Sequence, residues 1–171
     1  MCNKKKSSLN HGFVLILFGV LIGLFIKLFV FDILNVSGVS MEPNVKDKSS
    51  VIVGKLSFGL VKPFGDDLII QWGSPKPDDI ILYYYNNKTV IKRCVAVAGD
   101  TLEFSAFQGY SVCAGENTIP LKESQYQRLK HNSVVPEGMI FAVGDNYAES
   151  IDSRDYGFVS EKNILGKVLF R

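Results

Sequence analysis

FVLILFGVLIGLFIKLFVF, from Phe13 to Phe31, is an apolar run in which Lys27 is the sole charged residue. An α-helix rises about 1.5 Å per residue, so this run would extend for about 30 Å, the thickness of a bilayer's hydrocarbon core. Lys27 lies near the distal end, where its long side chain can carry the ammonium group to the lipid headgroups. The run therefore predicts a single transmembrane helix.

The charges on either side of the run predict its orientation. The lysine cluster Lys4–Lys6 precedes it, whereas no Lys or Arg follows it before Lys46. Positive charge concentrates on the cytoplasmic side of membrane segments. We therefore expect three parts: a cytoplasmic N-terminus at 1–12, a transmembrane anchor at 13–31 and an extracytoplasmic domain at 32–171.

A cleavable signal peptide is the competing interpretation of this run. Cleavage would need small side chains at its end, but Phe29, Val30, Phe31, Ile33 and Leu34 stand there. We therefore expect the segment to be an uncleaved anchor.

The composition argues against two kinds of binding site. Lys and Arg number 19 and Asp and Glu 17, and the basic residues form no stripe of the kind that binds nucleic acid. His11 and His131 lie far apart, with no cysteines at ligand spacing. We therefore expect no nucleic-acid partner, no metal and no cofactor.

The cysteines leave two possibilities open. Cys2 lies on the predicted cytoplasmic side and cannot pair with the other two. Cys94 and Cys113 each stand in an apolar, strand-like context. That context is compatible with a disulfide in an oxidising compartment and equally with buried free thiols.

After the anchor the pattern is typical of a mainly β protein. Short runs rich in Val, Ile, Tyr and Phe alternate with clusters of Gly, Pro, Asn and Asp. Sustained helical periodicity is missing, except for a turn or two near Ser160–Ile164. Asn86-Asn87, between two of the runs, predicts a tight hairpin. We expect strands at 33–36, 50–53, 80–85, 89–97, 101–107, 110–113, 139–143 and 165–170.

The segment Leu56–Trp72 is predicted to be a loop or the edge of a lobe, although it is rich in apolar residues. Two interpretations are open. The segment either covers the core or dips into the membrane interface, where Trp is favoured.

Ser40 and Lys92 are candidates for a nucleophile and its general base. A serine hydroxyl needs a base to take its proton, and a lysine can serve when burial keeps it neutral. Strand alternation places Lys92 on the same face as Val90 and Cys94, while Arg93 points the other way. Taken alone, each of the two residues would be interpreted as an ordinary residue with no role in catalysis.

Four motifs, in order, resemble those of the bacterial type I signal peptidases, membrane-bound serine proteases with a Ser-Lys dyad. Ser40-Met41-Glu42-Pro43, preceded by Gly38, is similar to the nucleophile motif Ser-Met-x-Pro. Asp79-Ile80-Ile81-Leu82 is similar to Gly-Asp-Ile-Val. Residues 91–95 with Gly99-Asp100 are similar to Lys-Arg-Val…Pro-Gly-Asp, which carries the base. Residues 144–157 match Gly-Asp-Asn…Ser-x-Asp-Ser-Arg…Gly, including its spacing.

The resemblance implies a fold and a set of roles. The domain after the anchor would be an antiparallel β-sheet catalytic domain with a small, reduced second lobe. Ser40 would be the nucleophile, with its backbone N–H in the oxyanion hole, and Lys92 the general base. The Ser150 hydroxyl would orient the Lys92 amine. The supporting residues would be Arg93, Asp145, Asp152 and Arg154 as structural ion pairs, with Gly38, Met41 and Asn146 from the motifs.

The chain departs from the family pattern without touching the dyad. Asn44 stands for the usual Thr, Ala98 for a Pro and Tyr147 for a frequent Arg. Asn44 can still hydrogen-bond locally. Gly38 stands where some relatives carry a serine hydroxyl, so the second oxyanion donor is left open.

The resemblance also implies the partners and the place of action. The substrates would be signal-peptide-bearing precursors, cut after small-x-small sequences such as Ala-x-Ala at the outer face of a bacterial cytoplasmic membrane. An extended segment of the precursor would add to a sheet edge near Ser40. Two alternatives stay open: a Ser-Lys processing peptidase with narrower clients, as in conjugation or pilus assembly, and a catalytically silent, membrane-anchored binding protein.

Overall fold

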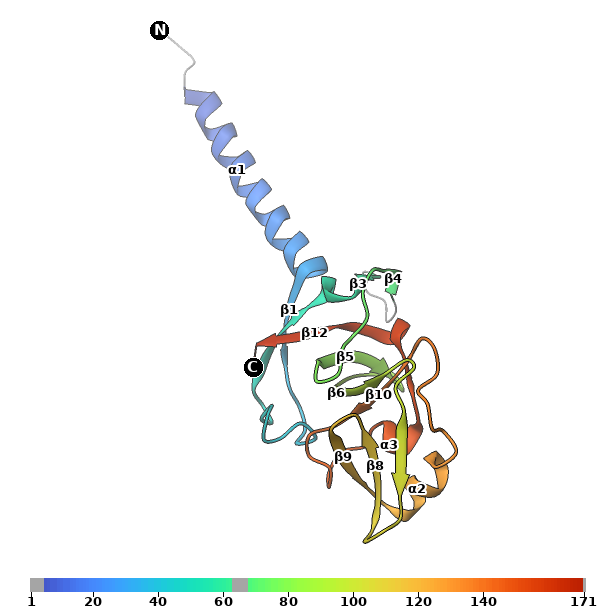
Figure 1. Cartoon of the computed structure of the whole chain (residues 1–171). Helices are drawn as coiled ribbons and strands as arrows, with labels where there is room; N and C mark the ends of the chain where they lie inside the picture. Colours follow the sequence, from blue (N-terminus) through green and yellow to red (C-terminus); the bar gives the residue numbers. More distant parts are fainter. Residues whose placement is uncertain (1–4, 63–67, 171) are drawn as a thin grey trace.

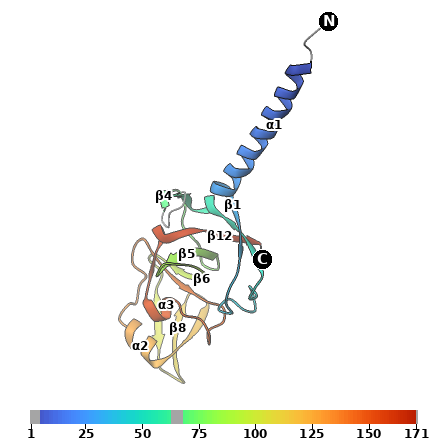
Figure 2. The same ribbon diagram turned by 180° about the vertical axis from the view of Figure 1, so that it is seen from behind.

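The computed structural model describes residues 5–62 and 68–170. Helix α1 (Lys5–Phe25) continues through a π-helical turn, η1 (Ile26–Val30), into strand β1 (Phe31–Asn35). Figures 1 and 2 show α1 projecting from one end of a β-domain. Residues His11–Val30 are long and apolar enough to cross a membrane, and no part of that window is buried against the rest of the chain.

Most of the β-domain is one antiparallel sheet of seven strands, in the order β1-β2-β12-β5-β6-β10-β11. Its central strand, β5, carries buried side chains on both faces, because Ile80 and Leu82 pack in one apolar cluster and Ile81 and Tyr83 in another. The strands after β1 are β2 (Ser50–Gly54), β5 (Ile80–Tyr85), β6 (Lys88–Val97), β10 (Met139–Val143), β11 (Val159–Ser160) and β12 (Ile164–Phe170).

A smaller lobe lies at the end of the domain away from α1 (Figure 1). It is a three-stranded antiparallel sheet of β7 (Leu102–Ser105), β8 (Tyr110–Ala114) and β9 (Asn117–Leu121), packed on helix α2 (Glu123–Leu129). Its core is continuous with residues of β6 and β10, such as Val95 and Phe141. The predicted mainly β fold, with one apolar helix and a small second lobe, is confirmed.

The hairpin between β5 and β6 sets the position of the candidate base. Asn86 and Asn87 both have positive φ, 48° and 60°, as a tight turn requires. The predicted hairpin is therefore confirmed. Its register pairs Tyr85 with Lys88 and Ile81 with Lys92, which brings Lys92 to the middle of the sheet.

The structure contains elements that the sequence pattern did not predict. The segment expected to be a loop forms a hairpin of β3 (Gly59–Val61) and β4 (Leu68–Gln71). Strand β9 was missed because Pro120 interrupts its pattern, which an edge strand tolerates. Helices α2 and α3 (Ser153–Tyr156) were missed because one or two turns are too short to establish a period. At Ser160–Ile164 the structure has a 3-10 turn, η3 (Glu161–Asn163).

The cysteine question is answered for two of the three thiols. Cys94 is buried, Cys113 is half-buried, and both are free thiols. Burial raises the pKa of the Cys94 thiol to about 12. Cys2 lies outside the described residues.

Candidate active site

The loop that carries Ser40 connects β1 to β2 and is fixed by the residues around the serine. Met41 and Val45 are each 1% exposed and pack in the apolar cluster under the sheet, and the Val45 N–H donates to the Met41 carbonyl at 2.8 Å. Gly38 has φ +112°, which side-chain-bearing residues rarely adopt, and its N–H donates to Asp47 Oδ1 at 2.8 Å. These contacts hold Ser40 at the surface of a rigid turn.

Lys92 meets Ser40 at hydrogen-bond distance. Its Nζ lies 2.6 Å from Ser40 Oγ, although 52 positions separate the two residues in the chain. Lys92 is only 3% exposed. Burial is the main cause that lowers the pKa of Lys92; Asp152 opposes this effect and Arg154 reinforces it. The structure thus brings together the two residues that the sequence paired.

Asp152 is the carboxylate that raises the pKa of Lys92 most, and Arg154 neutralises its charge. Arg154 Nε and Nη2 donate to the two oxygens of Asp152, both at 2.9 Å, and both side chains are almost fully buried. Burial acts to raise the pKa of Asp152, but hydrogen bonds from Arg154, Ser150 and Gly144 outweigh it and hold that pKa below its usual value. The paired charges leave the amine of Lys92 in an environment with little net charge.

Ser150 lies beside the dyad but bonds elsewhere. Its hydroxyl donates to Asp152 Oδ2 at 2.6 Å, and among the described residues the hydrogen bond of the Lys92 amine is to Ser40. The orientation of Lys92 by Ser150 therefore stays a prediction. The contact that the structure does show for Ser150 is with the carboxylate that Arg154 neutralises.

Gly144 shapes the site in a way that the sequence analysis missed. A Cβ at this position would lie 2.2 Å from Ser150 Oγ and 2.5 Å from the Ser40 carbonyl oxygen. Its N–H donates to Asp152 Oδ2 at 3.0 Å. Any side chain at this position would therefore force Ser150 or the Ser40 backbone to shift. Its place at the head of the Gly-Asp-Asn motif was the signal that could have identified it.

The next two residues fasten the serine loop to the rest of the site. The Asn146 N–H donates to the Ser40 carbonyl at 3.0 Å and its side-chain amide to the Val39 carbonyl at 3.2 Å. Asp145 accepts two hydrogen bonds from Arg93, at 2.8 and 2.7 Å, and one from Asn44 at 2.8 Å. The Arg93–Asp145 and Asp152–Arg154 pairs thus form as the resemblance implied. The side-chain amide of Asn44 donates to Asp145, 101 positions away in the chain, whereas a local hydrogen bond was expected.

A groove of about 400 Å³ opens beside Ser40. Its walls come from the end of β1, the serine loop and the hairpin of β5 and β6, with Leu34, Met41, Leu82 and Ile91 among the lining side chains. Strand β10 pairs with β6 only from Arg93 onward, so the part of β6 before it is paired on one side, by β5. The groove therefore contains an open strand edge next to the hydroxyl.

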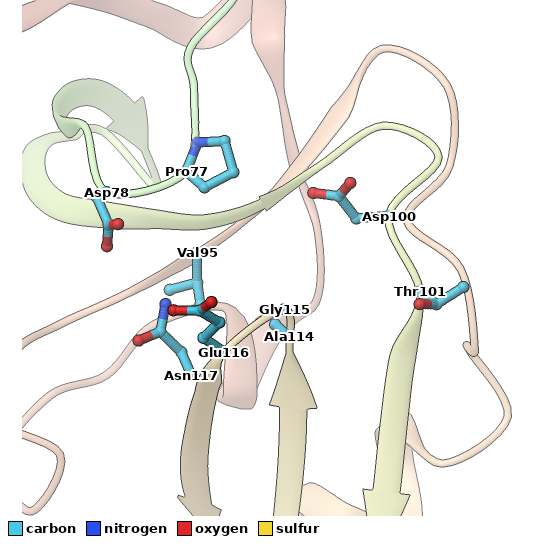
Figure 3. A pocket seen from close by; sticks show the side chains of 9 residues that line it. All are labelled: Pro77, Asp78, Val95, Asp100, Thr101, Ala114, Gly115, Glu116 and Asn117. Carbon is cyan, nitrogen blue, oxygen red and sulfur yellow. The ribbon is translucent and has the colours of Figure 1, made fainter.

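A second hollow, of about 390 Å³, lies between the end of β6 and the small lobe (Figure 3). Neither dyad residue lines it. Its carboxylates come from Asp78, Asp100 and Glu116, and Asp100 already accepts the Val97 N–H at 2.8 Å. Among the residues that the structure describes, no group of three or more His, Cys, Asp or Glu is arranged to hold a metal ion.

Matches to known proteins cover most of the chain. The profile of the family described as signal peptidase, peptidase S26, matches residues 9–171. Signal peptidase I V of Bacillus subtilis is 29% identical over 164 residues, covering 87% of this chain and 90% of that protein. Signal peptidase I of Bacillus caldolyticus is 31% identical over 161 residues, covering 85% and 81%. The crystal structure of a signal peptidase I from Enterococcus faecalis aligns at 27% identity and a TM-score of 0.41, over 56% of this chain and 97% of that chain. The chain belongs to the signal peptidase, peptidase S26, family.

Proposed function

We propose that Ser40 and Lys92 together carry out the peptide-bond hydrolysis by which this serine peptidase removes signal peptides. The observation that carries the proposal is the 2.6 Å separation of Lys92 Nζ and Ser40 Oγ, with the lysine buried. A neutral amine at this distance can accept the proton of the hydroxyl. Histidine is not needed for this chemistry.

The proton follows a closed path through the reaction. Ser40 Oγ attacks the carbonyl carbon of the scissile bond while its proton passes to Lys92 Nζ. When the tetrahedral intermediate collapses, the C–N bond breaks and the Lys92 ammonium returns the proton to the leaving amine. A water then attacks the acyl ester with Lys92 again as base, which releases the acid and restores Ser40.

The oxyanion is expected to be stabilised by the backbone of the serine loop. Among the described residues, no hydrogen-bond acceptor engages the Ser40 N–H, so this donor is available to the developing negative charge. The Gly38 N–H is already taken by Asp47. The Val39 carbonyl shares a peptide plane with the Ser40 N–H. It accepts hydrogen bonds from the Asn146 side-chain amide at 3.2 Å and from the Glu42 N–H at 3.1 Å, which fix the direction of the Ser40 N–H.

The substrate is proposed to lie in the groove as an added strand. The part of β6 from Lys88 to Ile91 offers backbone groups to an extended segment, and Thr89, Val90 and Ile91 line the groove. Preference for small side chains at the first and third positions before the cut would follow from shallow apolar pockets along this edge. The substrates are exported precursors that carry signal peptides.

The chain is proposed to act while anchored in a bacterial cytoplasmic membrane, with residues 1–12 inside, 13–31 in the bilayer and 32–171 outside. The support is the apolar span His11–Val30 and the distribution of lysines around it. Enzyme and precursor would then share one bilayer. This arrangement raises their effective concentration without new contacts.

Cleavage of a precursor by the detergent-solubilised full chain tests the proposal. Ser40→Ala and Lys92→Met should each lower kcat/KM by at least about 10³-fold, because loss of a nucleophile or its base removes the covalent route. Ser124→Ala and Lys130→Met, exposed residues of the small lobe, are the matched controls and should retain wild-type activity. Turnover at the wild-type rate by Ser40→Ala would refute the dyad.

A further inference from the structure

A further pocket lies where the apolar helix meets the β-domain. Its volume is about 360 Å³. Its charged lining consists of Lys27 from the end of the helix, Asp32 from β1, Lys55 from η2 (Lys55–Ser57) and Lys62 just after β3. Three positive charges and one negative charge give the lining a net charge of +2. Such a pocket attracts an anion.

The contacts divide these four residues into two pairs. Lys55 Nζ lies 3.0 Å from Asp32 Oδ2 and 3.4 Å from the Lys27 carbonyl oxygen, so Lys55 and Asp32 neutralise each other. Lys27 and Lys62 are exposed. Among the described residues, no ion pair or side-chain hydrogen bond engages the ammonium group of either. The excess positive charge of the pocket is therefore available to a ligand.

The apolar helix determines where the pocket lies relative to the membrane surface. Lys27 lies three residues before the end of the apolar span at Val30, a rise of roughly 4.5 Å, and its long side chain can carry the ammonium group over that distance to the headgroups. The remaining lining of the pocket is largely apolar and includes Leu28, Val61 and Leu165. A lining that combines positive charge with apolar side chains suits a molecule with an anionic headgroup and hydrocarbon chains.

The neighbouring hairpin supports the same depth. Ile69, Ile70 and Trp72 are 57%, 56% and 57% exposed. They belong to β4 and the residue that follows it, and both views of the chain place β4 at the anchor end of the domain (Figures 1 and 2). Exposed Ile and Trp side chains at the base of a membrane helix are covered when the hairpin rests in the interface.

We propose that this pocket binds the headgroup phosphate of an anionic phospholipid between Lys27 and Lys62. This inference rests on the proposed membrane anchoring of the chain. Each lysine near an anionic surface contributes binding free energy, and two lysines facing one phosphate add their effects. The acyl chains would leave past Leu28, in the apolar span, toward the bilayer.

The pocket adjoins the substrate groove. Leu34, Leu82 and Thr89 line both. A lipid held in the pocket would therefore fix the groove entrance at headgroup level, where a precursor leaves the membrane. Cleavage of a membrane-inserted precursor should then depend on anionic lipid, whereas cleavage of a short soluble peptide should not.

Native mass spectrometry of the full chain in detergent, with phosphatidylglycerol and phosphatidylcholine supplied together, tests the assignment. The wild type should retain phosphatidylglycerol, and Lys27→Gln/Lys62→Gln should lose it by at least about tenfold. Lys62→Gln alone, which leaves the anchor unchanged, should lose part of it, and Lys62→Arg should restore it. Lys76→Gln/Lys130→Gln removes two exposed lysines outside the pocket and should bind as the wild type does.

The outcomes distinguish a lipid headgroup from free phosphate as the ligand. They also distinguish a failure of the lipid pocket from a failure of the proposed peptidase function. Retention of the lipid in millimolar inorganic phosphate supports a lipid site, and displacement by free phosphate overturns it. Equal phosphatidylglycerol binding by Lys62→Gln, by the double variant and by wild type also overturns the site. Cleavage of a soluble peptide is measured on each sample. Loss of lipid with peptide cleavage intact supports the pocket, whereas absence of cleavage in every sample refutes the proposed function instead.

Discussion

Arg154 donates hydrogen bonds to both carboxylate oxygens of Asp152, from Nε and Nη2, each at 2.9 Å. Both residues are buried, as is Lys92. This pair resolves an electrostatic conflict. A neutral lysine base needs the absence of uncompensated negative charge, and Asp152 on its own would raise the pKa of Lys92. Arg154 cancels that influence at its source.

Arg154→Gln should move the acid limb of the pH profile of kcat/KM to higher pH. The buried Asp152 charge would then act unopposed and raise the pKa of Lys92, and that limb reports the base in the free enzyme. Loss of one partner of a buried pair also costs stability, about 3–5 kcal/mol. Asp152→Asn/Arg154→Gln removes both charges and should return the limb toward its wild-type position. An unchanged limb in folded Arg154→Gln would show that the pair does not set the lysine's protonation.

Gly144→Ala should lower kcat while the protein stays folded. The new Cβ would meet the Ser40 carbonyl oxygen, a backbone atom, so the nucleophile must shift. Misplacement of a reacting group by about 1 Å costs on the order of 10²-fold in rate. Gly73→Ala is the control, because its Cβ meets neighbours only from 3.4 Å outward. Full activity in Gly144→Ala would mean that a Cβ at position 144 does not displace Ser40.

Lys92→Met should stabilise the fold at neutral pH. A lysine in the unfolded chain has a pKa of about 10.4, and burial lowers the pKa of Lys92 in the folded state. Between those two values the unfolded chain binds more protons, so wild-type stability rises with pH there, and the full penalty is present below the folded pKa. Methionine removes that penalty. Guanidinium unfolding from neutral pH to about pH 10 should give a flatter curve for Lys92→Met than for wild type or Lys130→Met. Parallel curves would contradict a lowered lysine pKa.

Cys94 should resist alkylation in the native protein. Burial raises its pKa to about 12, so almost none of it is thiolate at neutral pH. Cys113, on β8, is half-buried and should react first. Peptide mapping after brief iodoacetamide treatment measures the order, and denaturation should equalise the two sites. Equal native labelling would place Cys94 nearer to solvent than the structure does.

The sequence predicted the parts of this protein that depend on local pattern. The apolar helix follows from a long apolar run and the hairpin from Asn86-Asn87. The face of the strand on which Lys92 lies follows from strand alternation. The identity of the dyad came from resemblance, because spacing alone does not relate two residues 52 positions apart.

Other features of the site could not be predicted, since they depend on tertiary contacts. Nothing local to Asn44 indicates that its amide reaches Asp145, 101 positions away. The resemblance implied that the Ser150 hydroxyl orients the Lys92 amine, and the hydrogen bond that the structure shows for this hydroxyl is to Asp152. Helix α2 is stabilised by packing on the small lobe and has too few turns to produce a period.

The titration of Lys92 itself tests the central claim most directly. NMR of the full chain in detergent micelles, with isotope-labelled lysine side chains and Lys92→Arg to assign the resonance, follows the Nζ protonation state across pH. We expect an apparent pKa clearly below the ordinary lysine value of about 10.4. A pKa at or above that value would contradict a neutral lysine acting as the base for Ser40.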